Sequence, residues 1–114
     1  MQRVDKPWGY ELIFAKTDRY VGKILFVRKG HKLSLQYHRK KEETIYLQGG
    51  VMLFTVEEDG ELVEKRMTAG ESHHIAPTVK HRMEAVEDCT IFEVSTTELD
   101  DVVRLEDVYG RAGS

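Results

Sequence analysis

The sequence predicts an all-β fold, a sandwich or a barrel, for three reasons. Short runs of strand-forming residues recur at roughly ten-residue spacing along most of the chain. Turn signals separate these runs, and Asp59-Gly60 is the clearest, because this pair accepts the positive φ of a type I′ hairpin turn. No stretch before Thr97 has the periodicity of a helix.

The expected strands are short, and most of them alternate apolar and polar residues. In chain order they cover residues 9–15, 20–28, 32–38, 43–47, 51–57, 62–67, 72–75, 82–86 and 90–95. The segment 98–107 is expected to form a short turn or helix, or an extended tail, that docks the C-terminus.

The size and charge of the chain exclude several classes of protein. Its 114 residues suffice for one domain, expected to span residues 1–114. The net charge is −3, from 17 Lys and Arg against 20 Asp and Glu, so we expect no nucleic-acid partner and no membrane partner. No apolar run approaches the ~20 residues of a membrane helix, and the N-terminus lacks the apolar centre of a signal peptide. Cys89 is the one cysteine, so no intramolecular disulfide forms, and we expect a cytoplasmic protein.

Two histidines, a glutamine and a glutamate form a candidate metal set. Gln36 and His38 lie two residues apart and therefore share a face of one expected strand. Glu43 shares a face with two apolar residues, which indicates that it points inward, and His81 follows a loop at residues 76–80. Imidazole, carboxylate and amide groups suit a divalent transition metal, which would be zinc, manganese, iron or nickel. On spacing alone, a solvated charged turn at Glu43 and a hydrogen-bonded edge residue at His81 are the simpler interpretation.

The order of these residues resembles the two sequence motifs of the cupin superfamily. The first motif is matched, with a glutamine in place of its first histidine, by Gly30, Gln36, His38, Glu43 and Gly50. The second is matched in spacing, with alanine and threonine in place of proline and glycine, by Gly70, Ala76, Thr78 and His81. This resemblance implies a single jelly-roll cupin barrel.

Four longer stretches resemble one cupin family in particular. They are Lys6-Pro7-Trp8-Gly9-Tyr10-Glu11, Leu33-Ser34-Leu35-Gln36-Tyr37-His38, His81-Arg82-Met83-Glu84 and the tail from Asp100 to Arg111. They are similar to the cupin domain of type II mannose-6-phosphate isomerases, which also follows the nucleotidyltransferase in bifunctional mannose-1-phosphate guanylyltransferases. The resemblance implies a metal held by Gln36, His38, Glu43 and His81. Ile45 and Ala85 replace a tryptophan and an asparagine of the family, and these changes bear on the substrate.

Three further residues are candidates for catalysis. Arg104, in the matched tail, could hold a sugar phosphate or a developing negative charge if the tail folds over the barrel mouth, and a salt bridge to a nearby carboxylate is the equal alternative. Glu93 is a candidate general base if it points inward, although pairing with a surface cation is the simpler expectation. His73 and His74 lie on opposite faces of one strand, and we expect His74 to face the cavity.

The resemblance, together with the candidate metal set, implies a metal-dependent aldose–ketose isomerase of a sugar phosphate, with mannose 6-phosphate and fructose 6-phosphate as the leading pair. Lys6 and Lys23 are expected at the surface, with phosphate contact as the alternative. Two other functions stay open: a non-catalytic metal-containing cupin that binds a small sugar, sugar phosphate or sugar nucleotide, and an iron dioxygenase. We also expect a homodimer to which the N-terminal strand contributes, because dimerisation covers exposed sheet edges.

Overall fold

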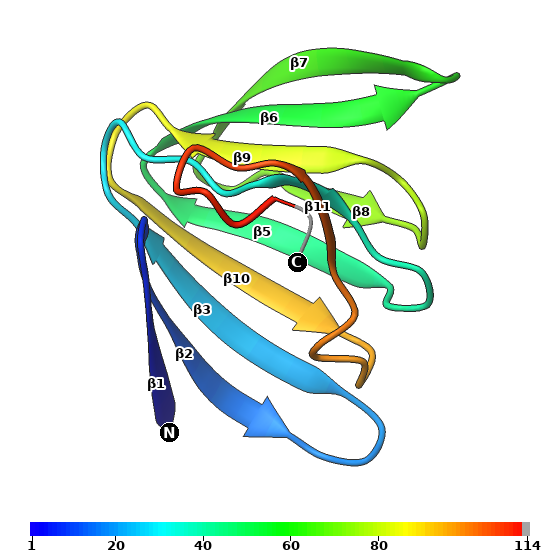
Figure 1. Ribbon diagram of the computed structural model, residues 1–114. Helices are drawn as coiled ribbons and strands as arrows, with labels where there is room; N and C mark the ends of the chain where they lie inside the picture. Colours follow the sequence, from blue (N-terminus) through cyan, green and yellow to red (C-terminus); the bar gives the residue numbers. More distant parts are fainter. Residues whose placement is uncertain (113–114) are drawn as a thin grey trace.

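The computed structural model describes residues 1–112, which form two antiparallel sheets (Figure 1). The strands are β1 (Gln2–Lys6), β2 (Gly9–Lys16), β3 (Val21–Val27), β4 (Leu35–Tyr37), β5 (Glu43–Gly49), β6 (Val51–Glu58), β7 (Glu61–Thr68), β8 (Ser72–Ile75), β9 (His81–Ala85), β10 (Cys89–Ser95) and β11 (Val103–Glu106). Within residues 1–112 there is no helix, and therefore none long and apolar enough to cross a membrane.

The two sheets contain strands that are far apart in the sequence. One sheet has six strands in the order β1-β2-β3-β10-β5-β8, and the other has five in the order β11-β4-β9-β6-β7. The pairing of β3 with β10 and of β4 with β9 joins distant parts of the chain. Figure 1 shows the consequence: the C-terminal segment (orange to red) leaves β10 in one sheet and reaches β4 in the other. The sheets face each other as the two layers of a jelly roll.

The predicted all-β fold class is confirmed, and the expected strands between residues 9 and 95 are all present, with ends shifted by up to three residues. Asp59 and Gly60 have φ values of 54° and 80°, so the β6–β7 hairpin has the predicted type I′ turn. For the tail, the extended alternative is right and the helical one is wrong, because β11 forms a ladder with β4. The edge strand β1 was not expected, since only Val4 and Lys6 of its residues are even half-buried.

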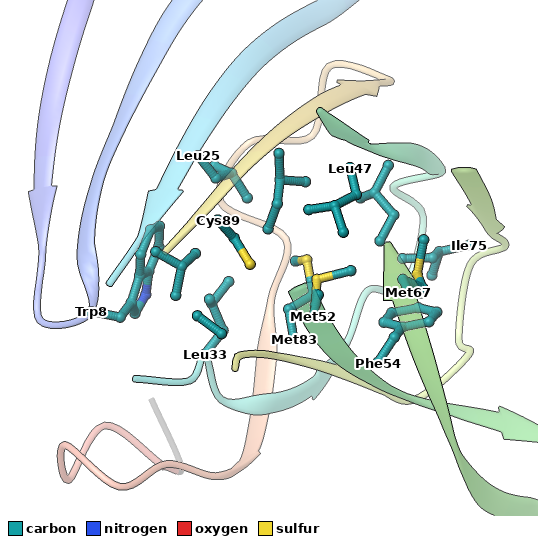
Figure 2. Packing of buried hydrophobic residues seen from close by; sticks show 14 of the residues in the cluster. Trp8, Leu25, Leu33, Leu47, Met52, Phe54, Met67, Ile75, Met83 and Cys89 are labelled. Carbon is teal, nitrogen blue, oxygen red and sulfur yellow. The ribbon is translucent and has the colours of Figure 1, made fainter. Parts of the chain in front are cut away.

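The core lies between the sheets and is built from inward-facing side chains of both. Strand alternation places Leu47, Ile91 and Met52 inside, each with no exposed surface. Figure 2 shows Leu25, Leu47 and Cys89 on one side of this cluster and Leu33, Met52 and Met83 on the other, with Trp8 at one end and Phe54 and Ile75 at the opposite end. Each large apolar side chain that is fully buried contributes about 1.5–3 kcal/mol. Trp8 and Cys89 both belong to this core.

Candidate metal centre

The buried face of the central strands changes from apolar to ionisable residues along their length. On β10 the inward sequence Cys89, Ile91 is followed by Glu93, and on β5 the apolar Ile45 and Leu47 lie beside Glu43. The same change occurs on β3 and β9, where Lys23 and His81 are buried next to Leu25 and Met83. Ionisable side chains therefore gather at one end of the space between the sheets.

Three of these side chains converge on a common point. His38, Glu43 and His81 are buried, and each offers one donor atom within 4.8 Å of the other two. The Nε2 atoms of His38 and His81 lie 3.3 and 3.1 Å from Oε1 of Glu43. Two imidazole nitrogens and a carboxylate oxygen form a donor set suited to a divalent transition metal.

The hydrogen bonds of the two imidazole rings define which nitrogen is available. Nδ1 of His38 donates to the carbonyl oxygen of Asp101 at 2.5 Å, and Nδ1 of His81 donates to that of Val79 at 3.0 Å. Since each ring donates from Nδ1, its Nε2 is the nitrogen available to a metal when the imidazole is neutral, and both Nε2 atoms lie beside Oε1 of Glu43. This second-sphere arrangement is typical of histidines that ligate a metal.

The two imidazoles contain buried atoms that nothing in residues 1–112 satisfies. Nε2 of His38 and Nε2 of His81 are buried and have no hydrogen-bond partner among the described residues. Oε2 of Glu43 also has no hydrogen-bond partner there, but it lies 3.3 Å from Nζ of Lys41. Such groups are rare in folded proteins, because leaving one unsatisfied costs about 1–3 kcal/mol. A bound cation would satisfy the two nitrogens and the carboxylate together, so the residues present fit a metal.

The ammonium group of Lys41 lies on the other side of Glu43 from the two histidines. Its Nζ lies 3.3 Å from Oε2 of Glu43 and 3.2 Å from Oε2 of Glu93. Burial raises the pKa of Glu43, but the two nearby imidazoles and the Lys41 ammonium outweigh burial and hold that pKa well below its usual range. Glu43 is therefore ionised, with Oε2 towards Lys41 and Oε1 towards the histidines.

Glu93 belongs to the same group of buried charged side chains, because Lys41 lies between it and Glu43. Burial and the negative charge of Glu43 raise its pKa to about 7, although Lys41 and Lys23 act in the opposite direction. Burial lowers the pKa of Lys41, but the charges of Glu93 and Glu43 outweigh burial and raise it above its usual value. Glu93 thus points inward, and the simpler expectation of a surface ion pair is wrong: its partner, Lys41, is also buried.

Gln36 and Arg104 lie in adjacent strands beside the cluster. Gln36 is the register partner of His81 on β9 and of Arg104 on β11, so the three side chains start from one row across the sheet. Gln36 and Arg104 both line the pocket that holds His38, Glu43 and Glu93, whose cavity volume is about 90 Å³. The C-terminal tail therefore folds against the pocket. This was the condition under which the sequence analysis expected Arg104 to hold a phosphate or a developing negative charge.

Further cationic side chains line this pocket. Lys6, Lys23, Arg104 and Arg111 all reach it, from both ends of the chain and from β3. Lys23 is buried and forms an ion pair with Glu11 at 3.3 Å, so the expected surface position is wrong for Lys23. Burial, and then the charges of Lys23, Arg104 and Arg111, lower the pKa of Lys6, although Glu11 opposes this.

His74 does not face the cavity, so this prediction is wrong. More than half of its side chain is exposed, and its Nε2 lies 2.5 Å from Oε2 of the equally exposed Glu42. His73 is the inward histidine of β8, and its ring lies 4.9 Å from that of Phe54, away from the metal cluster. The alternation of the strand was interpreted correctly, but its phase was not. Ile75, the one apolar residue of the strand, is buried and shares a face with His73, so it was a signal that could have set the phase.

Sequence reasoning missed two residues that organise the site. Lys41 was interpreted as part of a charged turn; its position two residues before Glu43, on the same face of an extended chain, is a signal that could have found it. The Asp101 carboxylate accepts hydrogen bonds from the backbone N–H groups of Arg39, Lys40 and Lys41, and these lower its pKa to about 2. No local pattern connects Asp101 to a loop sixty residues earlier.

Two antiparallel sheets around a buried His/Glu cluster are the architecture of a cupin, and solved structures support this class. Residues of this chain superpose on the capsular polysaccharide assembling protein CapF of Staphylococcus aureus with a TM-score of 0.81, at 19% identity, over 93% of this chain and 32% of that one. KdgF of a Halomonas species gives a TM-score of 0.74 at 20% identity, over 88% of this chain and 91% of KdgF. These likenesses establish the jelly-roll cupin fold.

The chain belongs to the mannose-6-phosphate isomerase C-terminal family, whose model matches residues 1–107. A curated relative is the mannose-1-phosphate guanylyltransferase of Escherichia coli K12, 32% identical over 96% of this chain. The chain spans about a quarter (23%) of that relative's length. The family resemblance carried by the four sequence stretches is thereby confirmed.

Proposed function

We propose that this chain is a metal-dependent aldose–ketose isomerase of a sugar phosphate, with mannose 6-phosphate and fructose 6-phosphate as the leading pair. The observation that carries the proposal is the trio of buried donor atoms on His38, Glu43 and His81, with both imidazoles oriented by backbone carbonyls. The family to which the chain belongs supplies the substrate class.

His38, Glu43 and His81 would hold the metal, with Gln36 as a fourth ligand from the adjacent strand. Zinc, manganese, iron and nickel all accept such a set. When bound, the metal supplies Lewis-acid polarisation of the substrate oxygens. Lys41 positions the carboxylate of Glu43 by pairing with the oxygen that faces away from the histidines.

Glu93 is the candidate general base. It is buried, lines the pocket and is connected to Glu43 through Lys41. The carboxylate would remove the proton from the hydroxyl-bearing carbon next to the sugar carbonyl and return it to the former carbonyl carbon. The proton of that hydroxyl would pass to the former carbonyl oxygen, so the aldose and the ketose interconvert with no other reactant.

Arg104 is the candidate for holding negative charge, together with other cations of the pocket. Arg104, Lys6 and Arg111 line the same cavity as Glu93. A guanidinium can form two parallel hydrogen bonds with a phosphate, and it also stabilises an oxyanion that develops during proton transfer. These cations favour a phosphorylated sugar over a neutral one.

A time course of mannose 6-phosphate by NMR tests this proposal directly. We expect fructose 6-phosphate to appear with the wild-type chain in the presence of zinc or manganese, and to stop appearing after chelation or in His81→Ala. His74→Ala is the matched control, because His74 lies outside the pocket, and it should retain turnover. Turnover that survives both chelation and His81→Ala would contradict the proposal.

The second candidate is a non-catalytic metal-containing cupin that binds a sugar, sugar phosphate or sugar nucleotide. It is favoured by the short span of the chain, about a quarter of its guanylyltransferase relative, because the activity of the whole relative need not reside in this part. The same experiment separates the two: metal-dependent shifts of the sugar-phosphate resonances without product would support the binding function and reject the isomerase.

A further inference from the structure

One residue of the C-terminal tail, Asp101, contacts the metal centre in two ways. Its backbone carbonyl oxygen accepts the Nδ1–H of His38 at 2.5 Å. Its carboxylate accepts three backbone N–H groups of the loop between β4 and β5, at 3.0 Å from Arg39, 2.7 Å from Lys40 and 3.0 Å from Lys41. A single residue thus holds a candidate ligand ring and the loop that follows this ring in the chain.

The two candidate histidine ligands differ in how their rings are oriented. The carbonyl that accepts the Nδ1–H of His81 belongs to Val79, two residues earlier in the same segment. The carbonyl that accepts the Nδ1–H of His38 belongs to Asp101, 63 residues later in the chain. The orientation of His81 is therefore a local property of its loop, whereas that of His38 depends on where the tail lies.

The side chain of Asp101 attaches the tail at this place. Asp101 lies in the turn at residues 97–102, between β10 and β11, and the backbone N–H groups of Leu99, Asp101 and Val102 donate to carbonyls of the same turn. These bonds shape the turn but do not attach it to the sheets. The carboxylate supplies an attachment, because hydrogen bonds from three N–H groups to an ionised carboxylate are stronger than bonds between neutral groups.

The same turn also forms part of the pocket. Leu99 and Val102 line it. On the other side of the Asp101 carboxylate, the loop that it holds includes Lys41, whose ammonium lies 3.3 Å from Oε2 of Glu43. Asp101 therefore joins the wall of the pocket to the residues that surround the metal set.

We propose that Asp101 is a positioning residue: by docking the tail, its carboxylate holds the carbonyl that orients His38, and the affinity of the site for a divalent metal depends on this contact. A metal on Nε2 polarises the imidazole ring and makes Nδ1–H a stronger donor to the Asp101 carbonyl. Metal binding and tail docking should therefore strengthen each other by the same factor. The inference rests on the metal set of the proposed function and not on the isomerase reaction.

The affinity for zinc, measured by competition with a chromophoric chelator, tests the proposal. Asp101→Asn replaces one of the two acceptor oxygens by an amide group that cannot accept, and Asp101→Ala removes both. We expect zinc to bind these variants about 10–100-fold more weakly than the wild type, with the larger loss in Asp101→Ala. Asp100→Ala is the matched control: Asp100 is exposed and carries the same charge at the adjacent position, so this variant should keep the wild-type affinity within about threefold.

The metal-free chain provides a second readout. Nitrogen NMR of the imidazole rings at about pH 8 reports which ring nitrogen carries the proton. His38 should carry it on Nδ1 in the wild type and shift it towards Nε2 in Asp101→Ala, because the carbonyl acceptor is displaced while Oε1 of Glu43 remains 3.3 Å from Nε2. His81 should keep its proton on Nδ1 in both chains and serves as the internal reference, since a general loss of folding would change both rings.

The outcomes separate this inference from the proposed function. Zinc affinities of Asp101→Ala and Asp100→Ala that agree within about threefold overturn the inference, because the loss of a nearby negative charge then accounts for the whole effect. A His38 ring that keeps its proton on Nδ1 in Asp101→Ala overturns it as well. A wild-type chain that binds no zinc contradicts the proposed function instead, and the proton position of His38 then decides by itself whether Asp101 positions the ring.

Discussion

The two ends of the space between the sheets are built from the same strands and differ in chemistry. At one end Leu47, Met52 and Ile91 pack with no exposed surface and have no polar atoms to satisfy. At the other end the same strands contribute Glu43 and Glu93, and three buried polar atoms lack a hydrogen-bond partner among residues 1–112. The first end stabilises the fold by apolar burial alone, whereas the second end contains buried polar atoms that a bound metal would satisfy.

The apolar end therefore stabilises the fold, whereas the ionisable end contains the candidate functional site. Apolar burial is non-directional and adds about 25 cal/mol for each Å² removed from water, so the apolar end stabilises the domain with or without a ligand. Buried charges are costly unless they are paired. At the ionisable end, Lys23 pairs with Glu11, while Lys41 is shared between Glu43 and Glu93. The buried charges at this end are therefore only partly paired. The predictions below perturb each end in turn.

The largest effect is expected at the apolar end. Leu47→Ala should lower the free energy of unfolding by roughly 4 kcal/mol, because the side chain is fully buried and the cavity cannot fill with solvent. Chemical denaturation of the metal-free chain measures this. Leu62→Ala, the same substitution at an exposed leucine, should change stability by less than about 0.5 kcal/mol. Equal losses at the two sites would contradict the assignment of Leu47 to the core.

The next effect concerns the ion pair of Glu11 and Lys23 on the pocket wall. Lys23→Met should destabilise the fold by about 3 kcal/mol, because the buried carboxyl group of Glu11 loses the ammonium that lies 3.3 Å away. The double variant Glu11→Met, Lys23→Met should recover most of that loss, since both members of the buried pair are then replaced by apolar side chains. A double-mutant cycle by chemical denaturation measures the coupling between the two side chains.

Lys16→Met is the control for this cycle, because Lys16 is exposed at the end of β2, and it should leave stability unchanged within about 0.5 kcal/mol. A loss below about 1 kcal/mol in Lys23→Met would show that the pair behaves as a surface salt bridge. The pocket wall at Glu11 and Lys23 would then be well solvated. The apolar and ionisable ends of the space between the sheets would in that case differ less in their exclusion of water than the burial of these two side chains indicates.

The fold and the grouping of His38, Glu43 and His81 were predictable, because turn residues, strand alternation and motif spacing indicate them in the sequence. Turn residues and strand alternation locate each strand without knowledge of its partners, as the Asp59-Gly60 hairpin illustrates. His38, Glu43 and His81 lie at motif spacings, and the structure brings them together. The role of these residues as ligands remains a prediction.

What was missed depends on contacts between distant segments. Lys41 is buried only because β5 and β10 are neighbours, which places Glu43 and Glu93 on either side of its ammonium. Asp101 binds the loop at Arg39 because the tail returns to the opposite sheet, and no period in the sequence encodes that return. The outward orientation of His74 was missed for a different reason: the strand is four residues long and offers one fully buried residue to set its phase.

The smallest expected effect joins the two ends. A divalent metal at a free concentration about 100 times its dissociation constant should raise the free energy of unfolding by about 2.7 kcal/mol, because it binds the folded state. Leu47 lies four residues along β5 from Glu43, or about 13 Å, so the gain should be the same in Leu47→Ala as in the wild type, within about 0.5 kcal/mol. His81→Ala should show no gain, because it removes a buried ligand atom. Thermal or chemical unfolding with and without zinc measures all three. A gain that disappears in Leu47→Ala would mean that the apolar end shapes the metal site, and that the two ends are one cooperative unit rather than a stabilising half and a binding half.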